Sequence, residues 1–142
     1  MSSSLTPPRR PSAVTAVAPA HAAAAEAYFA SEFEFETDCW DVHEALTSSP
    51  DFVLLDVRSP ALFARGHIAG AVNLPHGRIV EANLARWPAD TVFVTYCAGP
   101  HCTGAARGAL RLARLGRPVK RMNGGVTGWL DEGFVLVSAA AG

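Results

Sequence analysis

The sequence predicts an α/β domain built on a mostly parallel sheet. Residues 52–57 and 91–96 form continuous apolar runs, which are typical of strands buried on both faces, as in parallel sheets. Segments of helical character alternate with the strands, and this alternation favours a layered α/β architecture. The chain has 142 residues, of which 49% are hydrophobic, so it is long enough for one domain with a buried core.

The N-terminal region is expected to lie outside this domain. Residues 1–18 are rich in Ser, Pro, Ala and Thr and cannot bury enough apolar surface to offset the entropy of ordering, so we expect a disordered extension. Alanine dominates residues 19–32, and Pro19 stands where a first-turn proline is tolerated, which predicts an appended helix. The domain proper then occupies residues 33–138.

The first elements of the domain are a strand and a helix. Phe33, Phe35 and Thr37 alternate with acidic residues, a period-two pattern that predicts a short half-buried strand. Asp38 is well placed to cap a helix that runs to about Thr47. The chain then enters the first buried strand.

The remaining elements continue the alternation. A short strand is expected over residues 71–74, before the second buried strand. A helix over residues 103–115 follows, with Gly116 just past its end as a C-cap. A last short strand over residues 119–122 and a helix that opens at Gly124 complete the domain.

The feature with the most chemical content is Cys97, which ends the second buried strand. Ligands of open α/β sheets bind at the carboxyl ends of strands, and the loop after Cys97 leads to Thr103, which has the position of a helix N-cap. Inward-pointing N–H groups of such a loop form an anion-binding nest, and the helix N-terminus adds the positive end of its dipole. We therefore expect Cys97 to have a lowered pKa and to be a nucleophilic thiolate. A buried structural cysteine is the alternative.

The loop supplies the candidate substrate-binding residues, which are Ala98, Gly99, His101, Cys102 and Thr103. Cys102 is either a resolving thiol that converts a Cys97 persulfide into a disulfide or, as we favour, a small apolar residue beneath the helix. His101 either raises the positive potential near Cys97 or faces solvent. A zinc site on this loop is not expected, because the ligands are crowded and no clear fourth ligand follows.

Three further motifs occur along the chain, and their order and spacing resemble those of a known family. Residues 55–58 read Leu-Asp-Val-Arg, residues 66–75 read Gly-His-Ile-Ala-Gly-Ala-Val-Asn-Leu-Pro, and residues 124–129 read Gly-Gly-Val-Thr-Gly-Trp. Together with the cysteine after an apolar strand, they resemble the signature of the rhodanese-like domain family over about residues 35–134. The resemblance implies a five-stranded, mainly parallel sheet flanked by helices. It also implies a sulfurtransferase in which Cys97 takes sulfane sulfur from a donor such as thiosulfate and passes it to a nucleophilic acceptor.

The other motif residues are interpreted as structural. Asp56 and Arg58 stand at a strand end, where a carboxylate and a guanidinium can tie loops together by charge-assisted hydrogen bonds. His67 stands in a turn, where a histidine more often satisfies backbone groups than acts as a base.

The loop departs from the family pattern and leaves two alternatives open. It is long, it contains Pro100, which has no N–H to donate, and it contains no arginine. Relatives that act on phosphate or arsenate place an arginine about where Thr103 stands. A cysteine-dependent phosphatase or arsenate reductase is the alternative enzyme, and a non-catalytic partner-docking module is the alternative without chemistry. Three arginines follow on one helix stripe, either as a basic rim for anionic donors or, as we favour, as a solvated face: Arg107, Arg111 and Arg114.

Composition limits the partners. The net charge of −1 lacks the basic surplus of nucleic-acid-binding domains, and no run of about 18 apolar residues predicts a membrane span. The three cysteines suit a reducing compartment, and prolines interrupt any signal-peptide core, so we expect a cytoplasmic protein. The expected partners are a small anionic sulfur donor and a thiol or cyanide-like acceptor, with a protein as a further candidate acceptor. No motif predicts a cofactor.

Overall fold

The computed structural model describes residues 9–138. The chain divides into two compact units, residues 1–31 and 32–142. The helix predicted over residues 19–32 is α1 (Ala22–Phe35), and none of its residues is buried. Residues 1–8 of the expected disordered extension lie outside the described residues, so disorder of the extension stays a prediction.

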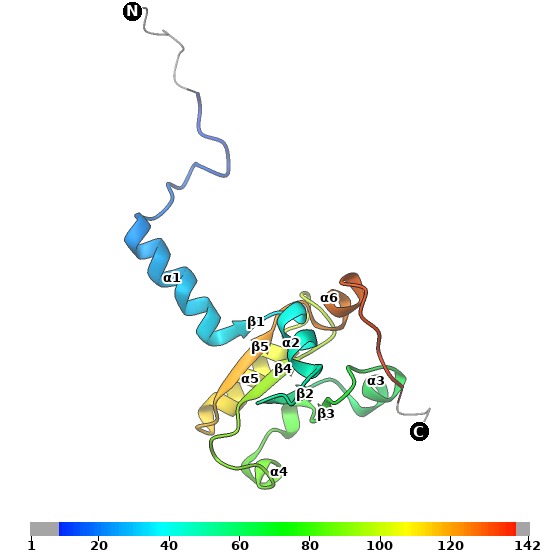
Figure 1. The fold of residues 1–142 in the computed structure, drawn as a ribbon. Coiled ribbons are helices and arrows are strands. Elements are labelled where there is room, and N and C mark those ends of the chain that lie inside the picture. Colours follow the sequence, from blue (N-terminus) through cyan, green and yellow to red (C-terminus); the bar gives the residue numbers. More distant parts are fainter. Residues whose placement is uncertain (1–8, 139–142) are drawn as a thin grey trace, which may run out of the picture. The chain divides into compact units, whose positions relative to one another are not determined.

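The second unit is built on a parallel sheet (Figure 1). Its strands are β1 (Glu36–Thr37), β2 (Val53–Asp56), β3 (Val72–Asn73), β4 (Phe93–Tyr96) and β5 (Val119–Met122). Within the described residues the sheet has five strands in the order β1-β5-β4-β2-β3, and every neighbouring pair is parallel. The predicted α/β class and five-stranded parallel sheet are therefore confirmed.

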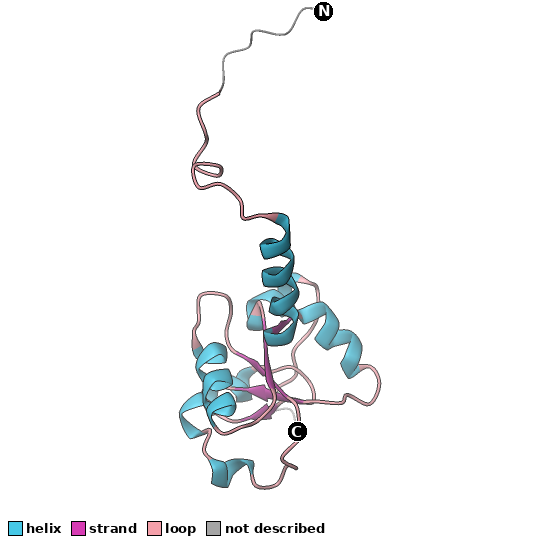
Figure 2. Cartoon of the chain, turned by 90° about the vertical axis from the view of Figure 1, so that its left-hand side faces the viewer, coloured by secondary structure: helices cyan, strands magenta, loops and turns pink. Residues whose placement is uncertain are grey.

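Helices connect the strands and lie on both sides of them (Figure 2). They are α2 (Cys39–Leu46), α3 (Pro60–Arg65), the 3₁₀ helix η1 (His76–Arg78), α4 (Glu81–Leu84), α5 (Gly104–Arg114) and α6 (Gly125–Asp131). The Asp38 carboxylate caps α2 as predicted, accepting the N–H of Asp41 at 2.8 Å. No helix in residues 9–138 has the length and apolar character needed to cross a membrane.

The strand predicted from the alternation of Phe33, Phe35 and Thr37 is wrong over most of its length. Phe33 and Phe35 belong to the last turns of α1, and their side chains are 74% and 65% exposed. Only Glu36 and Thr37 pair with the edge of the sheet, against β5. Because the alanine-rich helix continues through the phenylalanines, the alternation there reflects no buried strand face.

Each face of the sheet has its own core, because successive strand residues point to opposite sides. On one face, Leu54 and Val94 pack with α2 and α6 through buried residues that include Cys39 and Trp129. On the other face, the core contains the neighbouring strand residues Leu55 and Phe93, packed with Cys97, Ala105, Leu112, Ile79 and Leu84. Cys97 thus stands on the α5 side of the sheet, at the end of its central strand.

Candidate active site on the Cys97–Cys102 loop

Cys97 follows directly on β4 and is 6% exposed. Cys97 opens a loop, and the start of α6 holds this loop by two hydrogen bonds. The N–H of Val126 donates to the Cys97 carbonyl at 3.0 Å, and the N–H of Thr127 donates to the Ala98 carbonyl at 2.9 Å. A side chain at Gly125 (φ +58°) would collide with the Cys97 carbonyl and stand 2.7 Å from the nitrogen of Gly99. The double glycine therefore brings α6 against the cysteine loop.

The two thiols of the loop meet over the first residue of α5. A methyl carbon on Gly104 would lie 2.7 Å from Cys97 Sγ and 3.4 Å from Cys102 Sγ. The two thiols are also close enough to shift each other's pKa, that of Cys97 upward and that of Cys102 downward. The loop reaches this closed form through a turn in which the N–H of Cys102 donates to the Gly99 carbonyl at 3.0 Å.

The pKa values of the two thiols differ from the sequence-based expectation for Cys97. Burial raises the pKa of Cys97 to about 11, with further contributions from the neighbouring Cys102 thiol and the Asp56 charge, so the expected lowered pKa is wrong. Burial acts to raise the pKa of Cys102 as well, but the neighbouring Cys97 thiol and the N–H groups of Gly104 and Ala98 together lower it. The reason is positional, because the Gly104 N–H at the start of α5 points to Cys102 Sγ, 3.4 Å away.

The structure brings together some of the predicted loop residues and leaves others at the rim. Ala98 and Gly99 lie beside the two thiols, with Gly99 buried. His101 is exposed to solvent. Thr103 has the N-cap position of α5, but its hydroxyl accepts the Nε–H of Arg107 at 3.0 Å and does not cap the helix.

Two cavities among the described residues are each lined by both Cys97 and Cys102. The small cysteine cavity, about 280 Å³, lies toward β5 and is also lined by Gly99, Arg121 and Gly125. The large cysteine cavity, about 530 Å³, lies toward α3 and η1 and is also lined by Arg58, His76 and Arg107. A small molecule therefore has room to approach the thiols although Cys97 itself is nearly buried.

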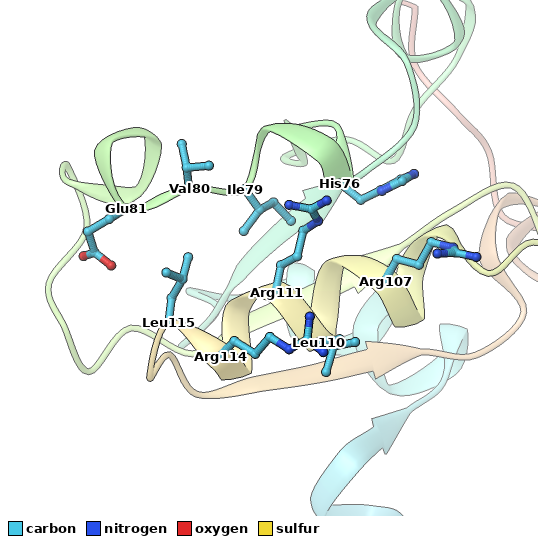
Figure 3. A pocket seen from close by; sticks show the side chains of 9 residues that line it. All are labelled: His76, Ile79, Val80, Glu81, Arg107, Leu110, Arg111, Arg114 and Leu115. Carbon is cyan, nitrogen blue, oxygen red and sulfur yellow. The ribbon is translucent and has the colours of Figure 1, made fainter.

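A third hollow, the arginine cavity of about 450 Å³, adjoins the large cysteine cavity, since His76 and Arg107 line both. Figure 3 shows its three arginines, Arg107, Arg111 and Arg114, arising from α5 across from the segment of His76 to Glu81. Within residues 9–138 none of these arginines has a carboxylate partner. The three arginines thus line a cavity next to the thiols. The sequence favours a different interpretation, in which they form a solvent-exposed helix face without a binding role.

A buried polar network fixes the strand ends beside the thiols. Asp56, with no exposed surface, accepts hydrogen bonds from Arg58 Nε at 3.0 Å and Nη2 at 2.6 Å. It also accepts the hydroxyl of Tyr96 at 2.7 Å, and the pKa of that tyrosine is raised by burial and by Asp56. Arg58 Nη2 continues to the Gly66 carbonyl at 2.7 Å. These bonds tie loops together, as the sequence predicts for Asp56 and Arg58.

His67 serves the backbone, as the sequence predicts. Its Nδ1 is 2.9 Å from the Phe63 carbonyl, and its ring stacks on Phe63 with centroids 3.7 Å apart. Cys39 is likewise a core residue, with its thiol donating to the Asn123 carbonyl at 3.4 Å. In residues 9–138 no group of three or more His, Cys, Asp or Glu side chains is placed to hold a metal ion.

Sequence reasoning missed two residues that shape the site. Gly104 leaves the room in which both sulfurs stand, and the hydroxyl of Thr127 donates to the Ala98 carbonyl at 3.1 Å. The sequence does carry a signal at Gly104. Glycine has low helix propensity, so a glycine in the first turn of a helix indicates that a side chain there would not fit. Thr127 carries none that separates it from an ordinary exposed threonine.

Comparisons with known proteins identify the family of the chain. The sequence profile described as "Rhodanese-like domain" matches residues 40–132. The HTH-type transcriptional regulator Rv0324 of Mycobacterium tuberculosis is 38% identical over 90 residues, which are 58% of this chain and 39% of the regulator, so the chain spans well under half of that relative. A protein of Allochromatium vinosum described as "Sulfurtransferase" is 29% identical over 103 residues, covering 72% of this chain and 94% of that protein.

The fold has a close counterpart among solved structures. The BH2092 protein of Bacillus halodurans superimposes with a TM-score of 0.80 at 28% identity, covering 84% of this chain and 88% of that one. The family profile spans most of the chain, including β2 to β5 and the loop of both cysteines. The chain belongs to the rhodanese-like domain family.

Proposed function

We propose that the protein is a sulfurtransferase that takes sulfane sulfur from a small anionic donor such as thiosulfate and carries it as a persulfide on Cys97. The observation that carries this proposal is a thiol at the end of the central strand, with a second thiol nearby across Gly104 and with two cavities that both thiols line. Family membership and the relative described as a sulfurtransferase support the same class of reaction.

The pair of thiols supplies the proton transfer that a buried nucleophile needs. At neutral pH, Cys97 is a thiol, and the lowered pKa of the neighbouring Cys102 favours a thiolate that can accept its proton. As Cys97 Sγ attacks the outer sulfur of thiosulfate, its proton passes to Cys102. A sulfur–sulfur bond forms on Cys97, the sulfur–sulfur bond of thiosulfate breaks, and sulfite leaves.

The charge of the surroundings favours an anionic donor. Arg107 lines the large cysteine cavity, and Arg111 and Arg114 extend the positive charge along the adjoining arginine cavity. Clefts lined by one sign of charge raise the local concentration of opposite charge and speed association. We therefore propose the large cysteine cavity as the route of the donor, and of a thiol, cyanide-like or protein acceptor afterwards.

Intact-mass analysis after incubation with thiosulfate tests this function. The reduced full chain should gain one sulfur atom and release sulfite, and Cys97→Ser should do neither. Cys39→Ser is the matched control, because Cys39 is buried on the other face of the sheet and should leave the reaction unchanged. Absence of any sulfur adduct in the wild type and in Cys102→Ser would refute the proposal.

The same preparations test the alternative enzyme. The loop from Cys97 to Thr103 has no arginine, so a phosphate or arsenate group bound covalently to Cys97 would lack a bidentate partner within the loop. Aryl phosphate or arsenate turnover that depends on Cys97, without a sulfur adduct, would replace the sulfurtransferase proposal.

A further inference from the structure

The second thiol of the loop has a placement that sulfur loading on Cys97 alone does not require. Both sulfurs flank the point above Gly104 described above, at 2.7 Å and 3.4 Å from a methyl carbon placed there. Both are free thiols, and both line the small and the large cysteine cavities. A sulfur bound to Cys97 would therefore stand beside the Cys102 sulfur from the moment it is transferred.

The fold builds this closeness into the loop. The Cys102 N–H to Gly99 carbonyl turn folds the loop back on itself. The α6 N–H groups hold the loop from the other side, at Cys97 and Ala98. Backbone hydrogen bonds of the loop and the space over Gly104 thus support the closeness of the two sulfurs.

Cys102 is not simply an apolar filler beneath the helix, which is the role that the sequence favours. It is partly buried against the α5-side core, but it lines both cysteine cavities and accepts the N–H of Gly104 at 3.4 Å. The amide and the helix start favour its thiolate form, which is the form that attacks sulfur.

We propose that Cys102 resolves the Cys97 persulfide, so that the protein releases the sulfane sulfur as hydrogen sulfide and passes through a Cys97–Cys102 disulfide. This inference rests on the proposed persulfide chemistry of Cys97. It adds a reductive activity in which the sulfur leaves as sulfide and needs no separate sulfur acceptor.

The step balances in atoms and electrons. Cys102 Sγ attacks Cys97 Sγ, a bond forms between the two cysteine sulfurs, and the bond from Cys97 Sγ to the outer sulfur breaks. The outer sulfur leaves as HS⁻ with the proton of Cys102. It gains two electrons, which the two cysteine sulfurs lose on forming the disulfide. A dithiol reductant then returns two electrons and two protons to the loop and restores both thiols.

The test follows the fate of a single sulfur atom. Fully reduced chain, freed of reductant, is treated with thiosulfate, quenched with an alkylating agent, and analysed by non-reducing intact mass alongside a sulfide probe. The wild type should release sulfide in proportion to a species that lacks two hydrogens and resists alkylation at both loop cysteines. A dithiol reductant should make sulfide release continuous. Cys39→Ser should behave like the wild type.

Cys102→Ser should instead hold the extra sulfur on Cys97 and release no sulfide until an external thiol is added. Cys102→Ala repeats the measurement without a hydroxyl, and far-UV circular dichroism checks that both variants fold. Equal persulfide lifetimes in wild type and Cys102 variants would overturn this inference and leave sulfur transfer intact. No extra sulfur on Cys97 in any variant would overturn the persulfide chemistry itself, and this inference with it.

Discussion

Replacing Gly104 with alanine is expected to slow sulfur loading of Cys97 with little loss of stability. The new methyl carbon would stand 2.7 Å from Cys97 Sγ, whereas non-bonded heavy atoms prefer roughly 3.5–4.0 Å. The sulfur must therefore move by about 1 Å, and displacements of that size cost reacting groups on the order of 100-fold in rate. A single-turnover measurement of sulfite release should show this loss.

The stability of the same variant reflects two opposing effects. Alanine is the better helix former by about 1 kcal/mol, while forcing an extra methyl into a packed site costs roughly 1–3 kcal/mol. Urea unfolding should therefore show a loss of about 0–2 kcal/mol. Gly77→Ala is the matched control, since Gly77 also lines the large cysteine cavity but its methyl would meet nothing within 4 Å. A loading rate equal to that of the wild type would refute the assigned contact between Gly104 and the thiols.

Three further changes test the thiol pair, the buried network and the basic cavity. In Cys102→Ser the pH at which sulfur loading is half-maximal should rise, because the group with the lowered pKa is lost. Burial, the largest cause of the raised pKa of Cys97, remains when the smaller contributions of Cys102 are gone; an unchanged pH profile from pH 6 to roughly pH 10 would contradict this. Asp56→Asn should lower the free energy of unfolding by about 3–5 kcal/mol, because it leaves the Arg58 charge buried without its partner; urea unfolding measures this. Arg107→Ala should raise the KM for thiosulfate roughly fivefold at low salt and less at high salt, as expected when one contact charge worth about 1 kcal/mol is removed.

Matched controls separate these effects from general ones. Asp51→Asn removes an exposed carboxylate and should leave the unfolding free energy nearly unchanged, so a similar loss in both aspartate variants would argue against the Asp56 network. Arg65→Ala changes the net charge as Arg107→Ala does but lines none of the three cavities described above. Equal KM shifts in both arginine variants would assign the effect to overall charge.

The sheet was predictable because its central strands carry their own signal. Residues 52–57 and 91–96 enclose β2 and β4 within two residues, since a strand buried on both faces needs a continuous apolar run. The β1 edge was not predictable in the same way. Its two residues are too few for a pattern, and the phenylalanines that supplied one belong to a helix that ends just before the strand.

The site was predictable in its place and not in its electrostatics. A cysteine at the end of a buried parallel strand lies at the edge where ligands bind, and this follows from sequence order alone. Which sulfur receives the first N–H of α5 depends on how the loop folds back between Gly99 and Cys102. That turn depends on a few backbone hydrogen bonds and on the free space over Gly104. Neither feature produces a periodic pattern in the sequence.

The closeness of the two thiols links the two proposed activities. The same placement around Gly104 that lets Cys102 take the proton of Cys97 puts Cys102 near any sulfur that Cys97 receives. The fate of a persulfide is then a competition between Cys102 and an acceptor arriving through the large cysteine cavity. A stronger or more concentrated acceptor should therefore lower the sulfide released per sulfur loaded without changing the loading rate. Because both outcomes begin from one persulfide, their sum should stay equal to the sulfite released.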